Sequence, residues 1–87
     1  MEIEFSRAAR NALKAKSMPA DRRRQIVAEI EKLAANPKSP ELDVRPLADS
    51  DLWRLRVGSY RVLYSTDIAA GRLTIRLIGT RGDVYKR

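Results

Sequence analysis

The sequence predicts an α+β fold in which two N-terminal helices pack on one face of a small antiparallel sheet, in the order β-α-α-β-β-β. Three observations predict it: an alternating stretch at residues 2–5, helical spacing of apolar residues between 7 and 35, and alternating stretches after residue 52. The 87 residues should form a single domain, because so short a chain cannot support two hydrophobic cores. Helices on one face leave the other face of the sheet open to a ligand.

The first strand and the first helix follow directly from the N-terminus. Residues 2–5 alternate acidic and apolar side chains, which is the two-residue period of a strand with one buried face. Ser6 is a suitable N-cap for a helix from Arg7 to about Lys16. Its apolar residues recur at helical spacing: Ala9, Ala12 and Leu13.

A second helix begins after the break at Ser17-Met18-Pro19, because Pro is tolerated in a first helical turn but not in a helix interior. Its apolar stripe consists of Ile26, Val27, Ile30, Leu33 and Ala34. Asn36-Pro37 ends it. Its basic residues lie largely off the stripe and indicate a solvated face more than a dedicated RNA site: Arg22, Arg23, Arg24 and Lys32.

The second half of the chain predicts mostly strands. Residues 38–51 are rich in Pro, Ser and Asp and should be mostly loop, with a short extended piece around Val44 to Leu47. The strand from Leu52 to Val57 places Trp53, Leu55 and Val57 on one face and Arg54 and Arg56 on the other.

Two further strands complete the predicted sheet. Gly58-Ser59 fits a two-residue hairpin turn with Gly first, where a positive φ is needed. The return strand spans Tyr60 to Asp67, and a loop through Ala69-Ala70-Gly71 leads to a last strand from Arg72 to Gly79. In that strand we expect Leu73, Ile75 and Leu77 on one face, while Trp53, Tyr60 and Tyr64 should pack in the core or on the sheet.

Composition narrows the classes of function. The 18 Lys and Arg residues outnumber the 11 Asp and Glu residues, for a formal net charge of +7, and most of the bases are Arg. Arginine grips phosphates bidentately, so the partner is expected to be a nucleic acid rather than a membrane surface. Cys and His are both absent, so we expect no disulfide, no metal site and no cofactor. Without an apolar span or signal peptide, the expected location is cytoplasmic.

Three arginines should converge on the face of the sheet that carries no apolar core. Arg54 and Arg56 share that face, and Arg61 lies just across the tight turn. Arg81 and Tyr85 follow the last strand and are expected at the same rim. Taken singly, each has an ordinary structural explanation, but like charges on neighbouring strands are unfavourable without a bound anion.

Cleavage of RNA is one reaction that such a cluster suits. It needs an in-line 2′-OH, neutralisation of charge at the phosphorus, and a proton for the leaving 5′ oxygen. Arginine supplies the charge but is a poor base, since its pKa exceeds about 12. Proton transfer must then come from Tyr85, from a group with a strongly depressed pKa, or from the ribosome and the substrate.

The strand pair Leu52-Trp53-Arg54-Leu55-Arg56-Val57-Gly58-Ser59-Tyr60-Arg61-Val62-Leu63-Tyr64 closely resembles the central signature of the RelE/ParE toxin superfamily. Pro46-Leu47, residues 79–85 and the helix end at 33–37 extend the resemblance over nearly the whole chain. It implies a RelE-like fold and the toxin of a type II toxin-antitoxin system, neutralised by a cognate antitoxin. RelE-type members enter the ribosomal A site and cut mRNA there by 2′-OH attack, without a metal.

The resemblance also assigns roles to five residues. Arg54 and Arg56 stand where RelE-type enzymes have basic residues contacting the substrate. Arg61 and Arg81 match the arginines that hold the scissile phosphate, and Tyr85 matches a tyrosine proposed to stack on or orient the base. The chain departs from its relatives in having Thr80 in place of a His or Lys, Arg45 in place of a catalytic Glu of one branch, and Gly82 in place of a charged residue.

Two other functions stay open at this point. A ParE-like toxin of the same fold would bind and poison DNA gyrase, but it lacks the basic catalytic set. A non-catalytic module would use its basic face to bind RNA or an acidic antitoxin, which the departures from the family pattern leave possible. Ribosome-dependent cleavage separates the nuclease from both.

Overall fold

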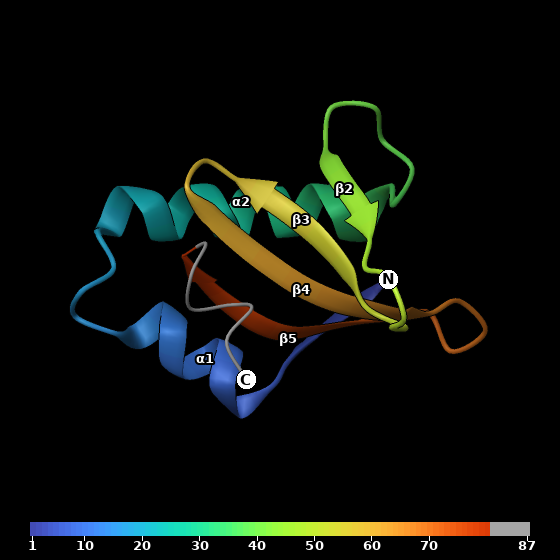
Figure 1. The fold of residues 1–87 in the computed structure, drawn as a ribbon, viewed down its shortest axis with the longest axis horizontal. Helices are drawn as coiled ribbons and strands as arrows, with labels where there is room; N and C mark the ends of the chain where they lie inside the picture. Colours follow the sequence, from blue (N-terminus) through green and yellow to red (C-terminus); the bar gives the residue numbers. More distant parts are fainter. Residues whose placement is uncertain (81–87) are drawn as a thin grey trace.

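The computed structural model of the protein describes residues 1–80 (Figure 1). Its elements, in chain order, are β1 (Glu2–Phe5), α1 (Arg7–Lys14), α2 (Ala20–Ala35), β2 (Asp43–Pro46), β3 (Trp53–Val57), β4 (Tyr60–Asp67) and β5 (Arg72–Thr80). The predicted α+β class is confirmed. The extended piece expected around residues 44–47 is a full strand of the sheet, β2, so the order is β-α-α-β-β-β-β.

All five strands of residues 1–80 form one sheet in the order β1-β5-β4-β3-β2. Strands β2 to β5 are an antiparallel meander, but β1 pairs parallel to β5, with Ile3 opposite Leu73. The expected purely antiparallel sheet is therefore wrong, and the sheet is mixed. Alternation along residues 2–5 reveals a half-buried strand but not the direction of its partner. The connection from β1 to β5 runs through both helices and strands β2 to β4, which is long enough for a parallel pair.

Helix α1 begins as predicted. The Ser6 side chain accepts a hydrogen bond from the backbone N–H of Ala9 at 3.0 Å, and its hydroxyl donates to the Arg76 carbonyl of β5 at 2.6 Å. One side chain therefore both caps the helix and ties its start to the sheet. The helix ends at Lys14, two residues before the predicted Lys16.

Arg23 of α2 holds the end of α1 in place. Its guanidinium donates to the backbone carbonyls of Leu13, Ala15 and Met18, at the last turn of α1 and in the connection that follows it. The expectation of a solvated helix face is therefore wrong for Arg23, although Arg22 and Arg24 are exposed. Helical spacing within α2 could not show this role, because the carbonyls belong to a different part of the chain.

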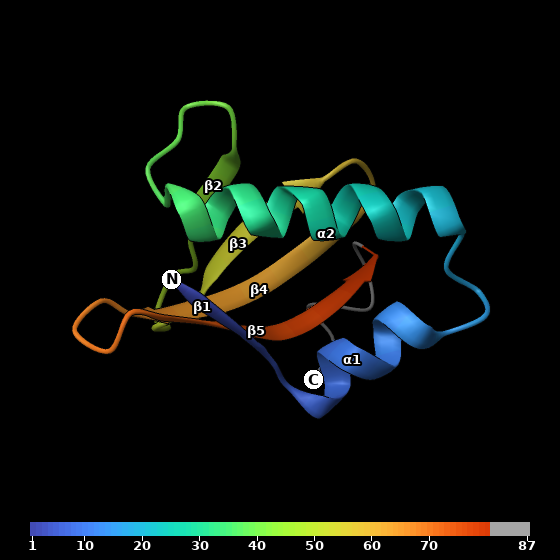
Figure 2. The ribbon, with the colours of Figure 1, turned by 180° about the vertical axis from the view of Figure 1, so that it is seen from behind.

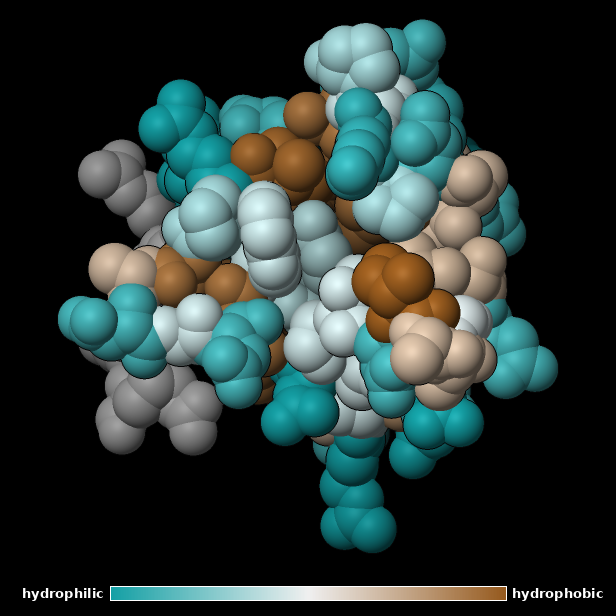
Figure 3. Space-filling model, turned by 90° about the vertical axis from the view of Figure 1, so that its right-hand side faces the viewer, coloured by the Kyte–Doolittle hydropathy of each residue, from teal (hydrophilic) through white to brown (hydrophobic). Residues whose placement is uncertain are grey.

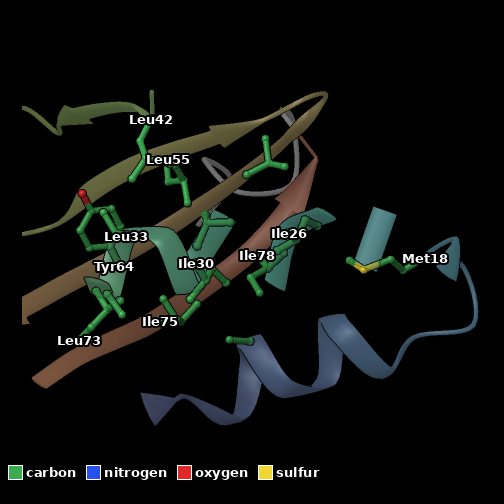
Figure 4. Close-up of a cluster of buried hydrophobic side chains, with 14 residues drawn as sticks. Met18, Ile26, Ile30, Leu33, Leu42, Leu55, Tyr64, Leu73, Ile75 and Ile78 are labelled. Carbon is green, nitrogen blue, oxygen red and sulfur yellow. The ribbon is translucent and has the colours of Figure 1, made fainter. Parts of the chain in front are cut away.

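The core lies between the helices and one face of the sheet. Helix α2 crosses that face, while α1 lies beside β5 (Figure 2). The largest fully buried side chains come from α2 and from three strands (Figure 4): Ile26, Ile30, Leu33, Leu55, Val62, Leu73 and Ile75. No polar or charged residue of the described part of the chain is buried in this core. The predicted stripe of α2 is the face that packs, except at Val27, which is only half-buried.

A bulge in β5 changes which residues face the core. Leu63 pairs with Leu77 and Tyr64 pairs with Ile75, so Arg76 is an extra residue on β5. Beyond the bulge the alternation is shifted by one, and Ile78 joins the core in place of Leu77. The predicted face of Leu73, Ile75 and Leu77 is therefore wrong at its last member.

The hairpin between β3 and β4 matches the prediction. Val57 pairs with Tyr60, and Gly58 between them has a φ of 59°. That left-handed conformation is strained for a residue with a Cβ. The turn fixes the register of the two strands, and with it the relative positions of the arginines that they carry.

Candidate functional site

The strand register gathers four arginines on the face of the sheet that points away from the helices. Arg54 of β3 pairs with Arg45 of β2, and Arg56 of β3 pairs with Arg61 of β4. Core residues alternate with them along the same strands, so all four side chains lie on the opposite face. The structure thus brings Arg54, Arg56 and Arg61 together, as the alternation predicts, and adds Arg45.

Asp43 supplies a carboxylate to this cluster. Its Oδ1 lies 3.3 Å from Nη2 of Arg54, and its Oδ2 lies 3.6 Å from Nε of Arg56. Sequence reasoning missed Asp43, because residues 38–51 were expected to be mostly loop. The alternation Asp43-Val44-Arg45 was the available signal, since an inward Val44 places its two neighbours on the arginine face.

Arg61 differs from Arg54 and Arg56 because it has no ion pair with any residue between 1 and 80. Its Nε is buried and has no hydrogen-bond partner there, and the same holds for Nε of Arg54. Arg61 pairs with Gly79 of the neighbouring strand β5, and Gly79 has no side chain that could contact the guanidinium. A buried N–H without a partner costs about 1–3 kcal/mol, so Nε of Arg61 lowers the stability of the free protein.

Arg81 and Tyr85, also expected at this site, lie outside the described residues. The last described residue, Thr80, pairs with Tyr60 next to Arg61. The end of β5 therefore lies at the arginine end of the sheet.

Tyr64 can be assigned to the core rather than to the chemistry. It is 3% exposed, and burial raises the pKa of its phenol to about 12. A phenol with so high a pKa stays protonated near neutral pH and is a poor general base. The expectation that Tyr64 is a packing residue is confirmed.

Comparison with known families decides what kind of protein this is. A family model described as the ParE toxin of the type II toxin-antitoxin system, parDE, matches residues 3–85. The chain belongs to this family of toxins. The resemblance to the RelE/ParE superfamily seen in the strand pair is thereby confirmed.

Solved structures share the fold of the toxin over nearly its whole length. A chain of the archaeal RelE-RelB complex from Pyrococcus horikoshii OT3 is 27% identical, with a TM-score of 0.78 over 93% of this chain and 94% of that one. A YoeB/ParE toxin from Agrobacterium tumefaciens is 15% identical, with a TM-score of 0.80 over 93% and 99%. A chain of the intact RelBE complex from E. coli is 14% identical, with a TM-score of 0.74 over 92% and 95%.

The Agrobacterium and E. coli structures are too distant in sequence to support more than the shared fold. No curated protein matches the sequence of the toxin.

An apolar hollow lies at the end of the toxin that carries the β4–β5 loop. It has a volume of about 180 Å³ and is lined by Pro37, Lys38, Trp53, Tyr64, Thr66 and Ile68. Apolar side chains are visible among hydrophilic ones at this end (Figure 3). Trp53 is on the same face of β3 as Leu55 and Val57, as predicted, but it is 39% exposed and does not belong to the buried core.

Residues 1–80 provide neither a cluster of metal ligands nor a membrane-spanning helix. This part of the toxin has no group of three or more His, Cys, Asp or Glu side chains placed to hold a metal ion. Neither of its helices has the length and hydropathy needed to cross a membrane.

Proposed function

We propose that the toxin is a ribosome-dependent endoribonuclease that cuts mRNA in the A site by 2′-OH attack, without a metal, and so inhibits translation. The observation that supports this proposal is the guanidinium of Arg61, which has no ion pair within residues 1–80 and lies beside Arg54 and Arg56 on the face of the sheet that points away from the helices. Such a cation is suited to a phosphate that becomes more negative in the transition state.

The arginines take different parts in the proposed reaction. Arg61 holds the scissile phosphate and neutralises the charge that develops on its oxygens. Arg54 and Arg56 contact the phosphates next to the scissile one, because the neighbouring strands β3 and β4 can both contact an RNA backbone that runs across them. By resemblance, Arg81 is the second arginine on the scissile phosphate and Tyr85 stacks on or orients the base.

The arginines of this cluster are not suited to transfer the protons of the proposed reaction. Guanidinium groups stay protonated at neutral pH, and the buried Tyr64 phenol does as well. We therefore propose that the proton moves through Tyr85 or through groups of the ribosome and the RNA. This explains why activity should depend on the ribosome, which would also hold the 2′-OH in line with the phosphate.

A cognate antitoxin is the proposed regulator, and the cytoplasm is the proposed location. The P. horikoshii structure, which is 27% identical, is a complex of RelE with RelB. The net charge of +7 on 87 residues favours a partner that carries acidic residues. An antitoxin that covers the arginine face would exclude RNA from it.

The decisive experiment adds the purified toxin to programmed ribosomes and, separately, to naked mRNA, and maps new 5′ ends by primer extension. Wild type should cut only on ribosomes, Arg61→Ala and Arg81→Ala should not cut, and Arg24→Ala should behave as wild type. Arg24 is a matched control because it is an exposed arginine on α2.

The absence of cuts from both samples, with growth arrest on expression, would overturn the nuclease proposal. A supercoiling assay with purified gyrase would then test the ParE-like alternative directly.

A further inference from the structure

We propose that Asp43 occupies the anion-binding sides of Arg54 and Arg56 in the free toxin, so that a chain of phosphates must displace it in order to engage them. The inference rests on the proposed function in one respect, because the displacing ligand is an RNA backbone. Asp43 would then set the affinity of the arginine face for a free polyanion.

The geometry of the ion pairs supports competition. Each carboxylate oxygen of Asp43 faces a different arginine, at 3.3 Å from Arg54 Nη2 and 3.6 Å from Arg56 Nε. A carboxylate and a phosphate use the same N–H groups of a guanidinium, so both cannot hold the same edge at once. The Asp43 side chain is 48% exposed while that of Arg54 is 13% exposed, so solvent reaches the carboxylate more readily than the guanidinium.

The position of Asp43 in the sheet makes displacement feasible. Asp43 is the first residue of β2, an edge strand, and its Cα is opposite Arg56. Strand β2 is held to β3 by backbone pairing over four residue pairs, so the carboxylate is not needed to attach it. Exposed ion pairs are weak, so successive phosphates of a nucleic-acid backbone, each with one negative charge, can replace this carboxylate.

The same face contains arginines that Asp43 does not reach. Arg61 and Arg45 have no ion pair with any residue of the described chain. A single phosphate can therefore bind Arg61 without displacing a carboxylate of residues 1–80, whereas a longer backbone must also break both Asp43 pairs. A free polyanion should therefore bind this face more weakly than the number of its arginines suggests. An mRNA strand that the ribosome holds in place can still contact all four arginines.

The test is a binding measurement that does not depend on cleavage. The probe is a short fluorescein-labelled oligodeoxyadenylate, which has no 2′-OH and cannot be cut by the proposed reaction. Its affinity is measured by anisotropy over a range of salt concentrations for wild type, Asp43→Asn, Asp43→Glu and Glu4→Gln. Glu4 is the matched control, because it pairs with Arg72 at 3.4 Å on the same face at the other edge of the sheet.

The proposal predicts a specific difference between two variants of equal charge. Asp43→Asn should bind roughly fivefold more tightly than wild type, and Glu4→Gln should stay within about twofold. The plot of log affinity against log salt should steepen by about 0.7 for each additional phosphate that the arginines neutralise. Asp43→Glu should stay close to wild type, since it keeps the competing charge.

Two outcomes would overturn the proposal. Equal gains in Asp43→Asn and Glu4→Gln would show that net charge alone acts, and weaker binding by a folded Asp43→Asn would make Asp43 a positioning residue for the arginines. If Asp43→Asn does not fold, the variants Arg56→Gln and Arg61→Gln provide the test instead. Arg56→Gln should change the affinity for the oligodeoxyadenylate little, while Arg61→Gln should weaken it severalfold. Equal losses of affinity in the two variants would refute competition by Asp43. Absence of ribosome-dependent cleavage by the wild type would refute the proposed function but leave these results intact.

Discussion

Arg56 and Arg61 lie directly opposite one another across the β3–β4 hairpin, one residue pair from its turn. Like charges in directly opposed positions destabilise an antiparallel pair by a few tenths to about 1 kcal/mol. Asp43 offsets part of this repulsion at Arg56, but Arg61 has no counter-ion within residues 1–80. The hairpin therefore maintains an unfavourable pair that an RNA phosphate would relieve.

Replacing Arg61 with Met should separate stability from activity. The change removes the charge repulsion with Arg56, and it removes the buried Nε that has no hydrogen-bond partner. Met keeps an unbranched apolar side chain at this position. We expect the free energy of unfolding to rise by about 0.5–1 kcal/mol in low salt, and ribosome-dependent cleavage to fall by roughly 100-fold or more. Urea titration and primer extension measure the two effects.

The control for this prediction is Arg24→Met, which removes the same charge from an exposed site on α2. It should leave both quantities nearly unchanged. A loss of stability in Arg61→Met would show instead that the guanidinium contributes to the fold, and that it is not held at a cost for a ligand.

The Gly58 turn should be sensitive to a Cβ for backbone reasons alone. Gly58 has a φ of 59°, and a Cβ built there meets no heavy atom within 4 Å. Gly58→Ala should lower the free energy of unfolding by about 1–2 kcal/mol, and Gly58→Asn by less, because Asn tolerates the left-handed region. Urea denaturation of both variants tests this order. Equal losses would point to a cause other than φ.

Much of the fold was predictable because local patterns decide it. The apolar stripe of α2, the Ser6 cap and the Gly58 turn depend on neighbouring residues, and each was confirmed. The parallel pairing of β1 with β5 was not predictable, because a strand pattern contains no information about its partner. The bulge at Arg76 was hidden for a similar reason, since it is a property of two strands together.

The candidate site was predictable only where it lies on one hairpin. Arg54, Arg56 and Arg61 belong to two strands joined by a two-residue turn, so alternation and turn length place them together. Asp43 reaches the same face from β2, which is joined to β3 by a loop whose path the sequence does not specify. The alternation of Asp43, Val44 and Arg45 indicates which residues share a face of β2, but the pairing of β2 with β3 is seen only in the structure.

Arg23 should matter for stability although it lies among exposed arginines. Its guanidinium satisfies carbonyls of Leu13, Ala15 and Met18 at the end of α1 and after it. Arg23→Ala should lower the free energy of unfolding by about 1.5–3 kcal/mol, because charge-assisted bonds are lost and carbonyls are left without partners. Arg24→Ala, measured in the same thermal or urea titration, should change it by less than about 0.5 kcal/mol. Similar small effects in both would show that water replaces the Arg23 contacts.

Tyr64 should make the toxin lose stability in alkaline solution. Burial raises the pKa of its phenol from 10.0 to about 12, so between these values the unfolded chain releases the proton while the folded chain retains it. Stability from this group is therefore complete below pH 10 and declines as the pH rises toward 12, by an amount on the order of 1–2 kcal/mol.

Tyr64→Phe separates the effect of this phenol from all other effects of alkaline pH on stability. The hydroxyl of Tyr64 has no hydrogen-bond partner in residues 1–80, so Phe should preserve the packing near neutral pH. Urea unfolding at about pH 8 and at about pH 11, on either side of the ordinary phenol pKa, should show a smaller decline for the variant than for wild type. Parallel declines in the two proteins would mean that the Tyr64 phenol ionises as easily in the folded chain as in the unfolded one.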